Sequence, residues 1–406
     1  MTEAADPCAE QTTISVPRDL IGFAASGGGF RATLFHTGAL IRMNELGWLA
    51  RVDRFSGVSG GSIALGALAA AWPGLTFDGG RVPKKDFDEK FVGPVLRFSE
   101  RRIDVPAALW GLIPGQSPAD FLARAYRELV ANKTLQDLPV RPQFAFNASS
   151  LQTGVLVRFT RAYLRDYRAG CLPHPTLELA VAIAASSAFP PYLSPNVIRP
   201  PAPGLSGGEP ALADGRYRRR LVLTDGGVYD NLGLQTLASF RTVIASDGGS
   251  PGRVDPAPTR FFPAQVVRVL GIASEQTRAL RRHTLVTDIK EGRKVGTLWT
   301  IKTDINGYKT PPTDPLLRVH RTQIADLAAV KTRLWPYPEA TRRRLVNWGY
   351  AIADAGLRLH VGATGPAPSW PFGDHPLDGD VGTPPEALAE DGLDAPPPLP
   401  AMEVSV

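Results

Sequence analysis

Short apolar runs alternate with longer periodic stretches through the first part of the chain. Residues 20–25 and 52–58 are short apolar runs that end in glycine-rich turns, a pattern that predicts strands. Each is followed by a stretch with helical spacing of apolar positions, at residues 33–46 and 63–72. The chain therefore begins with two strand-turn-helix units.

The same criteria predict further elements downstream. Residues 152–154 separate two strands and predict a hairpin turn, and residues 199–215 predict a loop rich in Pro and Gly. Strands are predicted at residues 142–149, 155–160, 221–224, 241–246 and 298–303, and helices at residues 117–130, 176–188, 230–239, 274–295 and 338–359.

Composition divides the chain into three parts. Residues 1–17 predict a flexible arm, residues 18–361 a folded domain, and residues 362–406 a disordered tail poor in large apolar side chains. Within the domain, residues 73–116 predict an insertion or cap, and residues 250–361 a helix-rich C-terminal part. The apolar and arginine-rich stretch 95–113 has two interpretations: a lipid-facing lid, or a surface helix and loop packed on the core.

The formal charge of +6 favours contact with anionic surfaces, and phospholipid head groups fit as well as nucleic acid. No nucleic-acid-binding motif is present, so we predict no nucleic-acid partner. Cys8 and Cys171 show neither a disulfide framework nor metal-ligand spacing, and we predict two free thiols. Without a secretory signal or an apolar run of about eighteen residues, we expect a cytoplasmic protein that visits a membrane surface. An effector exported without a signal peptide would look the same.

The turn after residues 52–58 carries candidate chemistry. Gly57-x-Ser59-x-Gly61 fits a nucleophile elbow, in which a tight strand-to-helix turn leaves the serine hydroxyl exposed at the end of a sheet. The simpler interpretation is an ordinary helix N-terminus capped by Ser59 or Ser62.

A second turn, with three glycines at residues 27–29, opens the first helix. The backbone N–H groups of Gly27, Gly28 and Gly29 predict an anion site at a helix N-terminus, which would serve as an oxyanion hole in acyl transfer. Arg31 follows one residue later, after Phe30, and either binds a substrate phosphate or steadies the loop.

The third candidate is a carboxylate at the end of residues 221–225. Asp225 is followed by two glycines, so it could accept the proton of a serine nucleophile if its surroundings raise its proton affinity. Asp247 is a rival, because it also ends an apolar run and precedes two glycines.

Together these segments resemble the patatin-like phospholipases and the related cytosolic phospholipase A2 group. The similar blocks are SGGGFRA at 26–32, GVSGG at 57–61, ASSAFPPY at 185–192 and DGG at 225–227. The resemblance implies a three-layer α/β/α fold with a mainly parallel central sheet. It also implies a Ser-Asp dyad without histidine, Ser59 as nucleophile and Asp225 as base, and hydrolysis of phospholipid or lysophospholipid esters.

Three other functions compete with this one. A dinucleotide site would need an acid at the carboxyl end of the second strand, but Asp53 lies near its beginning. An α/β-hydrolase would need a late histidine in a loop after a strand, and His320 and His360 fall in helical surroundings. A catalytically idle lipid-binding protein of the same fold stays open as the alternative.

We therefore predict a lipid acyl hydrolase that uses no metal and no cofactor. Asp225 takes the proton of Ser59, and the N–H groups of residues 27–29 and of Gly60 hold the oxyanion.

Overall fold

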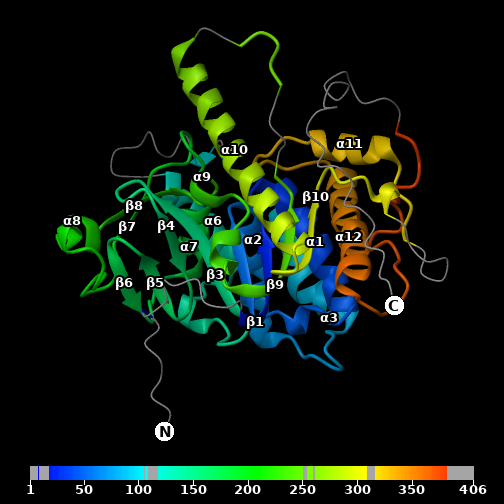
Figure 1. Ribbon diagram of the computed structural model, residues 1–406, viewed down its shortest axis with the longest axis horizontal. Coiled ribbons are helices and arrows are strands. Elements are labelled where there is room, and N and C mark those ends of the chain that lie inside the picture. Colours follow the sequence, from blue (N-terminus) through cyan, green and yellow to red (C-terminus); the bar gives the residue numbers. More distant parts are fainter. Residues whose placement is uncertain are drawn as a thin grey trace.

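A mixed sheet forms the centre of the molecule (Figure 1). The computed structural model describes residues 8, 18–104, 106–107, 118–249, 254–258, 261–308 and 316–381. The strands are β1 (Arg18–Ala25), β2 (Arg54–Val58), β3 (Gln143–Ser150), β4 (Leu156–Phe159), β5 (Tyr163–Asp166), β6 (Gly170–Pro173), β7 (Asn196–Ile198), β8 (Leu221–Asp225), β9 (Phe240–Asp247) and β10 (Val295–Thr300). Their order is β10-β9-β1-β2-β3-β4-β5-β6, with β8 pairing with both β3 and β7.

The central strands are parallel, as predicted. Strands β10, β9, β1, β2 and β3 run in one direction. Beyond β3 the sheet continues with antiparallel pairs. Ala25 at the end of β1 is in register with Gly57 of β2 and Ser246 of β9. Because the carboxyl ends of these three strands lie together, the loops that follow them meet at one edge of the sheet, which we call the carboxyl edge.

The longest of the described helices are α10, α12 and α1, and α1 and α2 follow β1 and β2 as predicted. The α-helices are α1 (Gly29–Glu45), α2 (Gly60–Ala71), α3 (Lys84–Phe87), α4 (Gly93–Phe98), α6 (Pro118–Leu129), α7 (Leu179–Ser186), α8 (Gly215–Arg218), α9 (Gly227–Asp230), α10 (Phe262–Lys290), α11 (Arg321–Ala329) and α12 (Glu339–Val361). Residues 88–92 form a π-helix, η3, and short 3₁₀ helices are η1 (Leu49–Arg51), η2 (Trp72–Gly74), η4 (Leu135–Asp137), η5 (Pro210–Leu212), η6 (Leu234–Leu237) and η7 (Ile305–Gly307). None of the described helices is both long and apolar enough to cross a bilayer.

Apolar side chains on both faces of the sheet pack against helices, which gives the fold three layers. Side chains alternate across a strand, so Phe23 of β1 joins the large cluster that includes α1, α2 and α12. The next residue, Ala24, joins a smaller cluster with Leu237 of η6 and Leu285 of α10. Helices therefore cover both faces, as expected for an α/β/α fold.

Residues 73–104 do not form a separate cap. Phe87, Phe91 and Phe98 are almost fully buried in the large cluster, so this segment completes the main core. In the stretch 95–113, the described part up to residue 104 is anchored by Val95 and Ile103, which favours packing on the core over a lid. Residues 105 and 108–113 lie outside the described part.

The C-terminal region contributes to the central sheet and to one of its helical layers. It supplies β10 to the central sheet and α12 to the layer beside α1, where Trp348 is fully buried. The expectation of disorder from residue 362 is wrong for residues 362–381. Leu377 is fully buried, and its carbonyl accepts a hydrogen bond from the His320 N–H at 2.7 Å. The few large apolar side chains of this segment are enough to anchor it. Residues 382–406, and residues 1–17 apart from Cys8, lie outside the described part.

The prediction of two free thiols is wrong. Cys8 and Cys171 form a disulfide that attaches the N-terminal region to β6, and Arg165 donates a hydrogen bond to the Cys8 carbonyl at 3.1 Å. The partners are 163 residues apart, so only the fold brings them together.

Candidate active site

Ser59 lies in a strained turn between β2 and α2, at the carboxyl edge. Its backbone φ of 50° and ψ of −117° are unusual for a residue with a side chain. A Cβ at Gly61 would lie 2.2 Å from the Ala25 carbonyl oxygen, so only glycine lets the turn pack this closely against β1. The Ser59 side chain makes no capping hydrogen bond to α2, which excludes the simple cap interpretation for this residue.

The block at residues 185–192 connects this turn to β8. The Ser186 hydroxyl accepts a hydrogen bond from the Ser59 N–H at 3.0 Å and pairs with the Ser62 hydroxyl at 2.8 Å. The carbonyl oxygens of Ser186 and Ala188 accept the N–H groups of Gly226 and Asp225, at 3.2 and 2.9 Å. One short segment therefore fixes both the serine turn and the aspartate. We assigned Ser186 no role from sequence, because a serine at the end of an apolar helix carries no distinctive pattern.

Asp225 ends β8 and is buried beside the serine turn. Its Oδ1 accepts the Gly227 N–H at 2.7 Å. Burial raises the pKa of this carboxyl from 3.8 to about 6, while hydrogen-bonding interactions with Gly227 and with the Ser59 hydroxyl lower that pKa by less. No hydrogen bond of standard geometry joins the two side chains, and Asp225 Oδ2 is buried without such a partner. Such loose contacts are common before a substrate binds.

Asp247, the rival aspartate, has different partners. Its Oδ1 accepts the Gly249 N–H at 2.9 Å, and its Oδ2 lies 3.6 Å from Arg278 Nε in α10. This carboxylate is therefore part of an ion pair with α10. Of the two candidates, Asp225 is therefore the carboxyl that meets Ser59.

The glycine loop supplies free N–H groups beside Ser59, but not all those predicted. Gly27 donates its N–H to the Asn231 carbonyl at 3.0 Å, so this group is not available to a ligand. Within the described residues, the N–H groups of Gly28, Gly29 and Gly60 have no recorded acceptor. A Cβ at Gly60 would lie 2.9 Å from Gly29 N, so the two turns touch. Of the four predicted donors, Gly28, Gly29 and Gly60 therefore keep N–H groups that could bind an anion.

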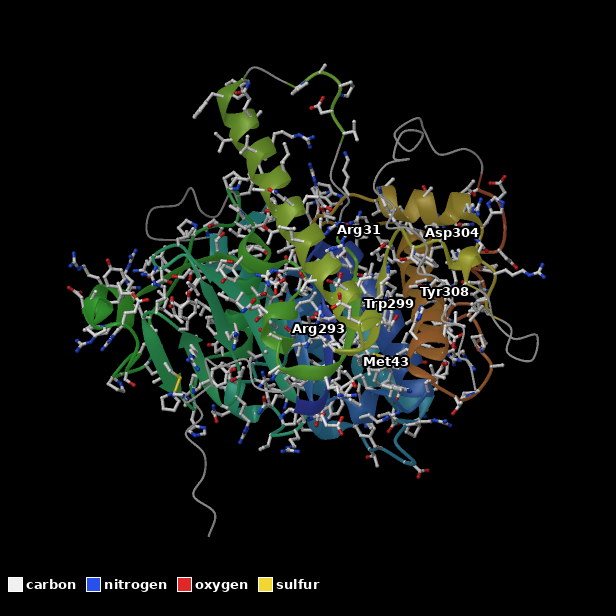
Figure 2. The ribbon with its side chains drawn as sticks, in the orientation of Figure 1. Arg31, Met43, Arg293, Trp299, Asp304 and Tyr308 are labelled. Carbon is white, nitrogen blue, oxygen red and sulfur yellow. A yellow bond between two sulfur atoms is a disulfide. The ribbon has the colours of Figure 1, made fainter. Side chains whose placement is uncertain are left out.

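Arg31 steadies the loop and is not placed to bind substrate. The side chain is 1% exposed and lies within the body of the molecule (Figure 2). Its guanidinium donates to the carbonyl oxygens of Ala328, Val330 and Gly248, at 2.7 to 3.2 Å. Burial lowers the pKa of Arg31 to about 10, so the group stays charged at neutral pH. Arg31 thus joins the start of α1 to the residue that follows β9 and to the C-terminal end of α11.

A buried histidine, His36, holds the start of the glycine loop through hydrogen bonds. His36 Nε2 bonds the Ser26 carbonyl at 3.0 Å, and its Nδ1 bonds the Ser246 hydroxyl at 2.9 Å. That hydroxyl also accepts the Trp299 indole N–H at 2.9 Å. Burial lowers the pKa of His36 to about 4, so the ring is neutral near pH 7. A lone histidine within an apolar helix gave no signal in the sequence.

The two rival enzyme classes do not fit this arrangement. Among the described residues, no histidine has a hydrogen bond to Ser59 or Asp225, as a hydrolase triad would require. Asp53 lies just before β2, where its Oδ2 accepts the Ile21 N–H at 2.8 Å. It is therefore at the opposite edge of the sheet from the glycine loop and cannot hold a ribose there.

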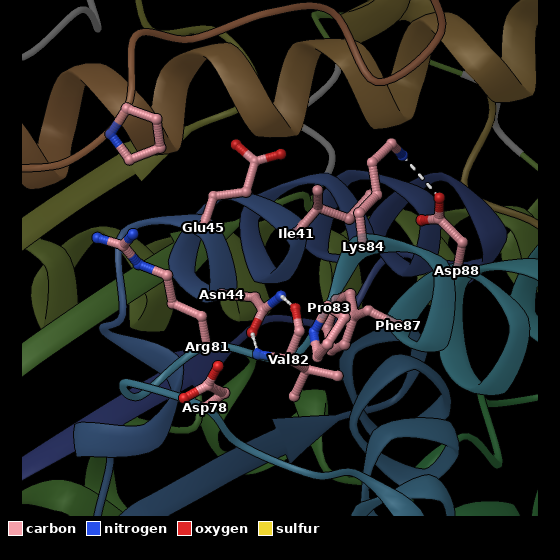
Figure 3. Close-up of a pocket in the computed structure, with 11 residues that line it drawn as sticks. Ile41, Asn44, Glu45, Asp78, Arg81, Val82, Pro83, Lys84, Phe87 and Asp88 are labelled. Atoms are coloured by element: carbon pink, nitrogen blue, oxygen red, sulfur yellow. Dashed lines mark hydrogen bonds and ion pairs between the residues drawn. The ribbon is translucent and has the colours of Figure 1, made fainter.

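A cavity of about 320 Å³ lies away from this site (Figure 3). Asn44 and Phe87 line it near the end of α1, and Asn44 is fixed by paired hydrogen bonds to the Val82 backbone, both 2.8 Å long. Because α1 begins at Gly29, its length separates the cavity from the glycine loop by roughly 24 Å. Within the described part of the chain, no group of three or more acidic, histidine or cysteine side chains is arranged to hold a metal ion.

Comparison with known families decides the relationship. Residues 23–238, just over half of the chain, match the family described as patatin-like phospholipase. The chain belongs to this family. The match contains Ser59, the glycine loop and Asp225, so the three candidate segments lie within the family domain. No curated protein sequence matches the chain.

Two solved structures show a distant likeness. Human GIVD cytosolic phospholipase A2 aligns with a TM-score of 0.46 and 12% identity, over 84% of this chain and 59% of that chain. VipD from Legionella pneumophila aligns with a TM-score of 0.34 and 14% identity, over 85% of this chain and 67% of that chain. This chain thus spans less than two thirds of the length of the human protein.

Proposed function

We propose that this patatin-like protein is a lipid acyl hydrolase of the phospholipase A or lysophospholipase type, in which Ser59 is the nucleophile and Asp225 the base. One observation carries the proposal: a buried carboxyl with a pKa of about 6 interacts with the hydroxyl of a serine in a strained turn. A carboxyl with that pKa is mostly ionised at pH 7 yet basic enough to take a proton.

The reaction follows from the positions of these groups. Asp225 accepts the Ser59 proton as Oγ attacks the acyl carbonyl. The carbonyl oxygen gains charge and accepts hydrogen bonds from Gly28, Gly29 and Gly60, which we propose as the oxyanion donors. The proton then passes from Asp225 to the departing lipid alcohol, leaving the acyl group on Ser59. Asp225 next removes a proton from water, whose attack releases the fatty acid and restores the serine.

The test is fatty-acid release from vesicles that contain phospholipid and lysophospholipid, with EDTA present throughout. We expect release by the parent chain and its loss in Ser59→Ala and Asp225→Asn. Ser206→Ala, at an exposed position in the antiparallel part of the fold, is the matched serine control. Asp247→Asn separates the two aspartates: if it alone abolished release while Asp225→Asn kept it, the base would be assigned wrongly.

A fluorophosphonate probe separates an idle site from an unsuitable substrate. The probe forms a covalent bond only with an activated serine, so the parent should be labelled and Ser59→Ala should not. A folded parent that neither releases fatty acid nor reacts with the probe would favour the lipid-binding alternative. Release that survives Ser59→Ala would contradict the mechanism.

A further inference from the structure

The first turns of α10, residues 262–273, project out of the domain, and we call them the projecting part of α10. In Figure 1 the helix rises out of the body, with its N-terminal end outermost. Residues 262–273 read FPAQVVRVLGIA, with Arg268 as the single charged residue. Phe262 is 73% exposed, Val269 62% and Ile272 53%. A helix this apolar is ordinarily buried.

Contacts made by the rest of α10 fix the direction in which the projecting part points. Arg278 lies 3.6 Å from Asp247, at the end of β9, and Arg281 lies 3.4 Å from Asp230, at the end of α9. Beyond the end of α10, Lys294 donates hydrogen bonds to Ala238 and Phe240 at the opposite edge of the sheet. The helix therefore crosses the sheet and leaves it at the carboxyl edge. Residues 262–277 add about 24 Å of helix, measured along its axis, beyond Arg278.

Other exposed apolar side chains lie at the same edge, close to the candidate site. Phe189 and Tyr192 follow Ala188, whose carbonyl accepts the Asp225 N–H, and are 55% and 63% exposed. Val228 lies in α9, directly after the aspartate turn, and is 43% exposed. We call these three side chains and residues 261–273 the apolar rim.

We propose that the projecting part of α10 inserts into one leaflet of a lipid bilayer and so places the carboxyl edge against the membrane. The inference rests on the proposed function, because it explains how a lipid ester would reach Ser59.

The distribution of apolar side chains favours lipid over a second copy of the chain. A protein partner covers one face of a helix, which leaves the other face polar. Here Val266, Val267, Val269, Leu270 and Ile272 are all exposed, and at 100° per residue they span about 220° of the helix circumference, which is wider than one face. Acyl chains surround an inserted helix and accept apolar groups on every side.

Length and charge agree with an insertion that stops within one leaflet. Twelve residues of helix extend about 18 Å, close to half of a hydrocarbon core of about 30 Å. Residues 261–273 contain no acidic side chain, while Arg268 lies on the projecting part and the chain carries a formal charge of +6. Anionic head groups would therefore be attracted to this surface.

Vesicle flotation in the Ser59→Ala background measures binding without hydrolysis. The vesicles contain phosphatidylcholine with or without phosphatidylglycerol. We expect the protein to bind, more tightly with the anionic lipid, and Leu270→Glu to weaken partitioning at least about tenfold. Val140→Glu, an exposed change before β3 at the opposite edge of the sheet, is the matched control and should bind normally. Equal binding by Leu270→Glu and the control would overturn the proposal.

A polarity-sensitive dye reports the insertion itself. The two native cysteines are joined to each other, so a thiol introduced by Leu270→Cys is available for labelling, and Val140→Cys is the control. Vesicles should shift the emission of the dye at position 270 to the blue and leave that at position 140 unchanged. A blue shift at position 270 without vesicles, together with a dimer in sedimentation that Leu270→Glu dissociates, would assign the rim to a second copy and overturn the proposal.

Hydrolysis assays keep this inference distinct from the proposed function. With Ser59 intact, Leu270→Glu should lose most of its activity on vesicles and retain activity on a water-soluble short-chain ester. Loss of both activities in folded Leu270→Glu would contradict a docking role. If the parent inserted into vesicles but hydrolysed neither substrate, the proposed function would fail and the insertion would stand.

Discussion

Replacing Asp225 by asparagine tests the electrostatics on which the proposed mechanism depends. Asparagine has nearly the same size and keeps an oxygen that can accept the Gly227 N–H, which lies 2.7 Å from Oδ1 in the parent. It removes the negative charge that burial makes unfavourable. We therefore expect Asp225→Asn to be inactive yet more stable than the parent at pH 8.

The size of the effect follows from the pKa of the aspartate. Burial raises this pKa from 3.8 to about 6, so the folded chain holds the proton more tightly than the unfolded chain does. The stability contributed by the proton is fully present below the unfolded pKa and is lost as pH rises through the folded value. The gap of roughly two pH units corresponds to about 3 kcal/mol at pH 8. At pH 4.5 roughly 1 kcal/mol of this is already lost, because the unfolded carboxyl is ionised there.

Urea denaturation of the two proteins at pH 4.5 and pH 8 measures this contribution. The difference in unfolding free energy, variant minus parent, should grow by about 2 kcal/mol between the two pH values, since the other titrating groups cancel. Asp378→Asn, at an exposed position, is the control and should show little change. A difference for Asp225→Asn that is the same at both pH values would refute the assignment of a raised pKa.

Three further predictions follow from the same contacts. The kcat/KM for ester hydrolysis should rise with pH through about 6 and level off above 7, because Asp225 with a pKa of about 6 must be ionised; a flat profile from pH 5 to 8 would contradict this. Gly29→Ala should lower kcat at least about a hundredfold, since the residue has a φ of 57° and its Cβ would lie 2.6 Å from the Arg333 carbonyl oxygen; Gly307→Ala, in open space, is the control, and unchanged kcat would argue against the loop as oxyanion hole. Cys171→Ser should lower the unfolding free energy by roughly 2–5 kcal/mol, because it opens a loop closed over 163 residues; denaturation curves unaffected by this change or by a reductant would show that the bond does not form.

Local patterns predicted the start of the fold well. The apolar runs before Ser59 and before the glycine loop are strands β2 and β1, and the helices after them are α2 and α1. These elements are short in sequence and end in strong turn signals, so neighbouring residues define them. The predicted helix at residues 274–295 begins twelve residues too late. Its first turns carry apolar side chains over more than half of the helix circumference, and such a run shows little of the periodicity that the prediction used.

The disulfide and the anchored segment 362–381 were missed for a different reason. Both depend on partners that are distant in sequence: Cys171 for Cys8, and the N–H of His320 for the carbonyl of Leu377. The composition of a segment gives the number of its apolar residues. It does not show whether the rest of the fold leaves room in the core for their side chains.

Short-range sequence patterns were enough to select the candidate residues: a serine between glycines, a glycine triplet and an aspartate, each in a turn after an apolar run. Their roles depend on contacts between segments far apart in the chain. Three such contacts appear only in the tertiary structure. The Gly27 N–H donates to the Asn231 carbonyl, and the Arg31 guanidinium donates to backbone carbonyl oxygens. Asp247 forms an ion pair with Arg278. Burial in the folded chain raises the pKa of Asp225, because desolvation depends on everything packed around a carboxyl.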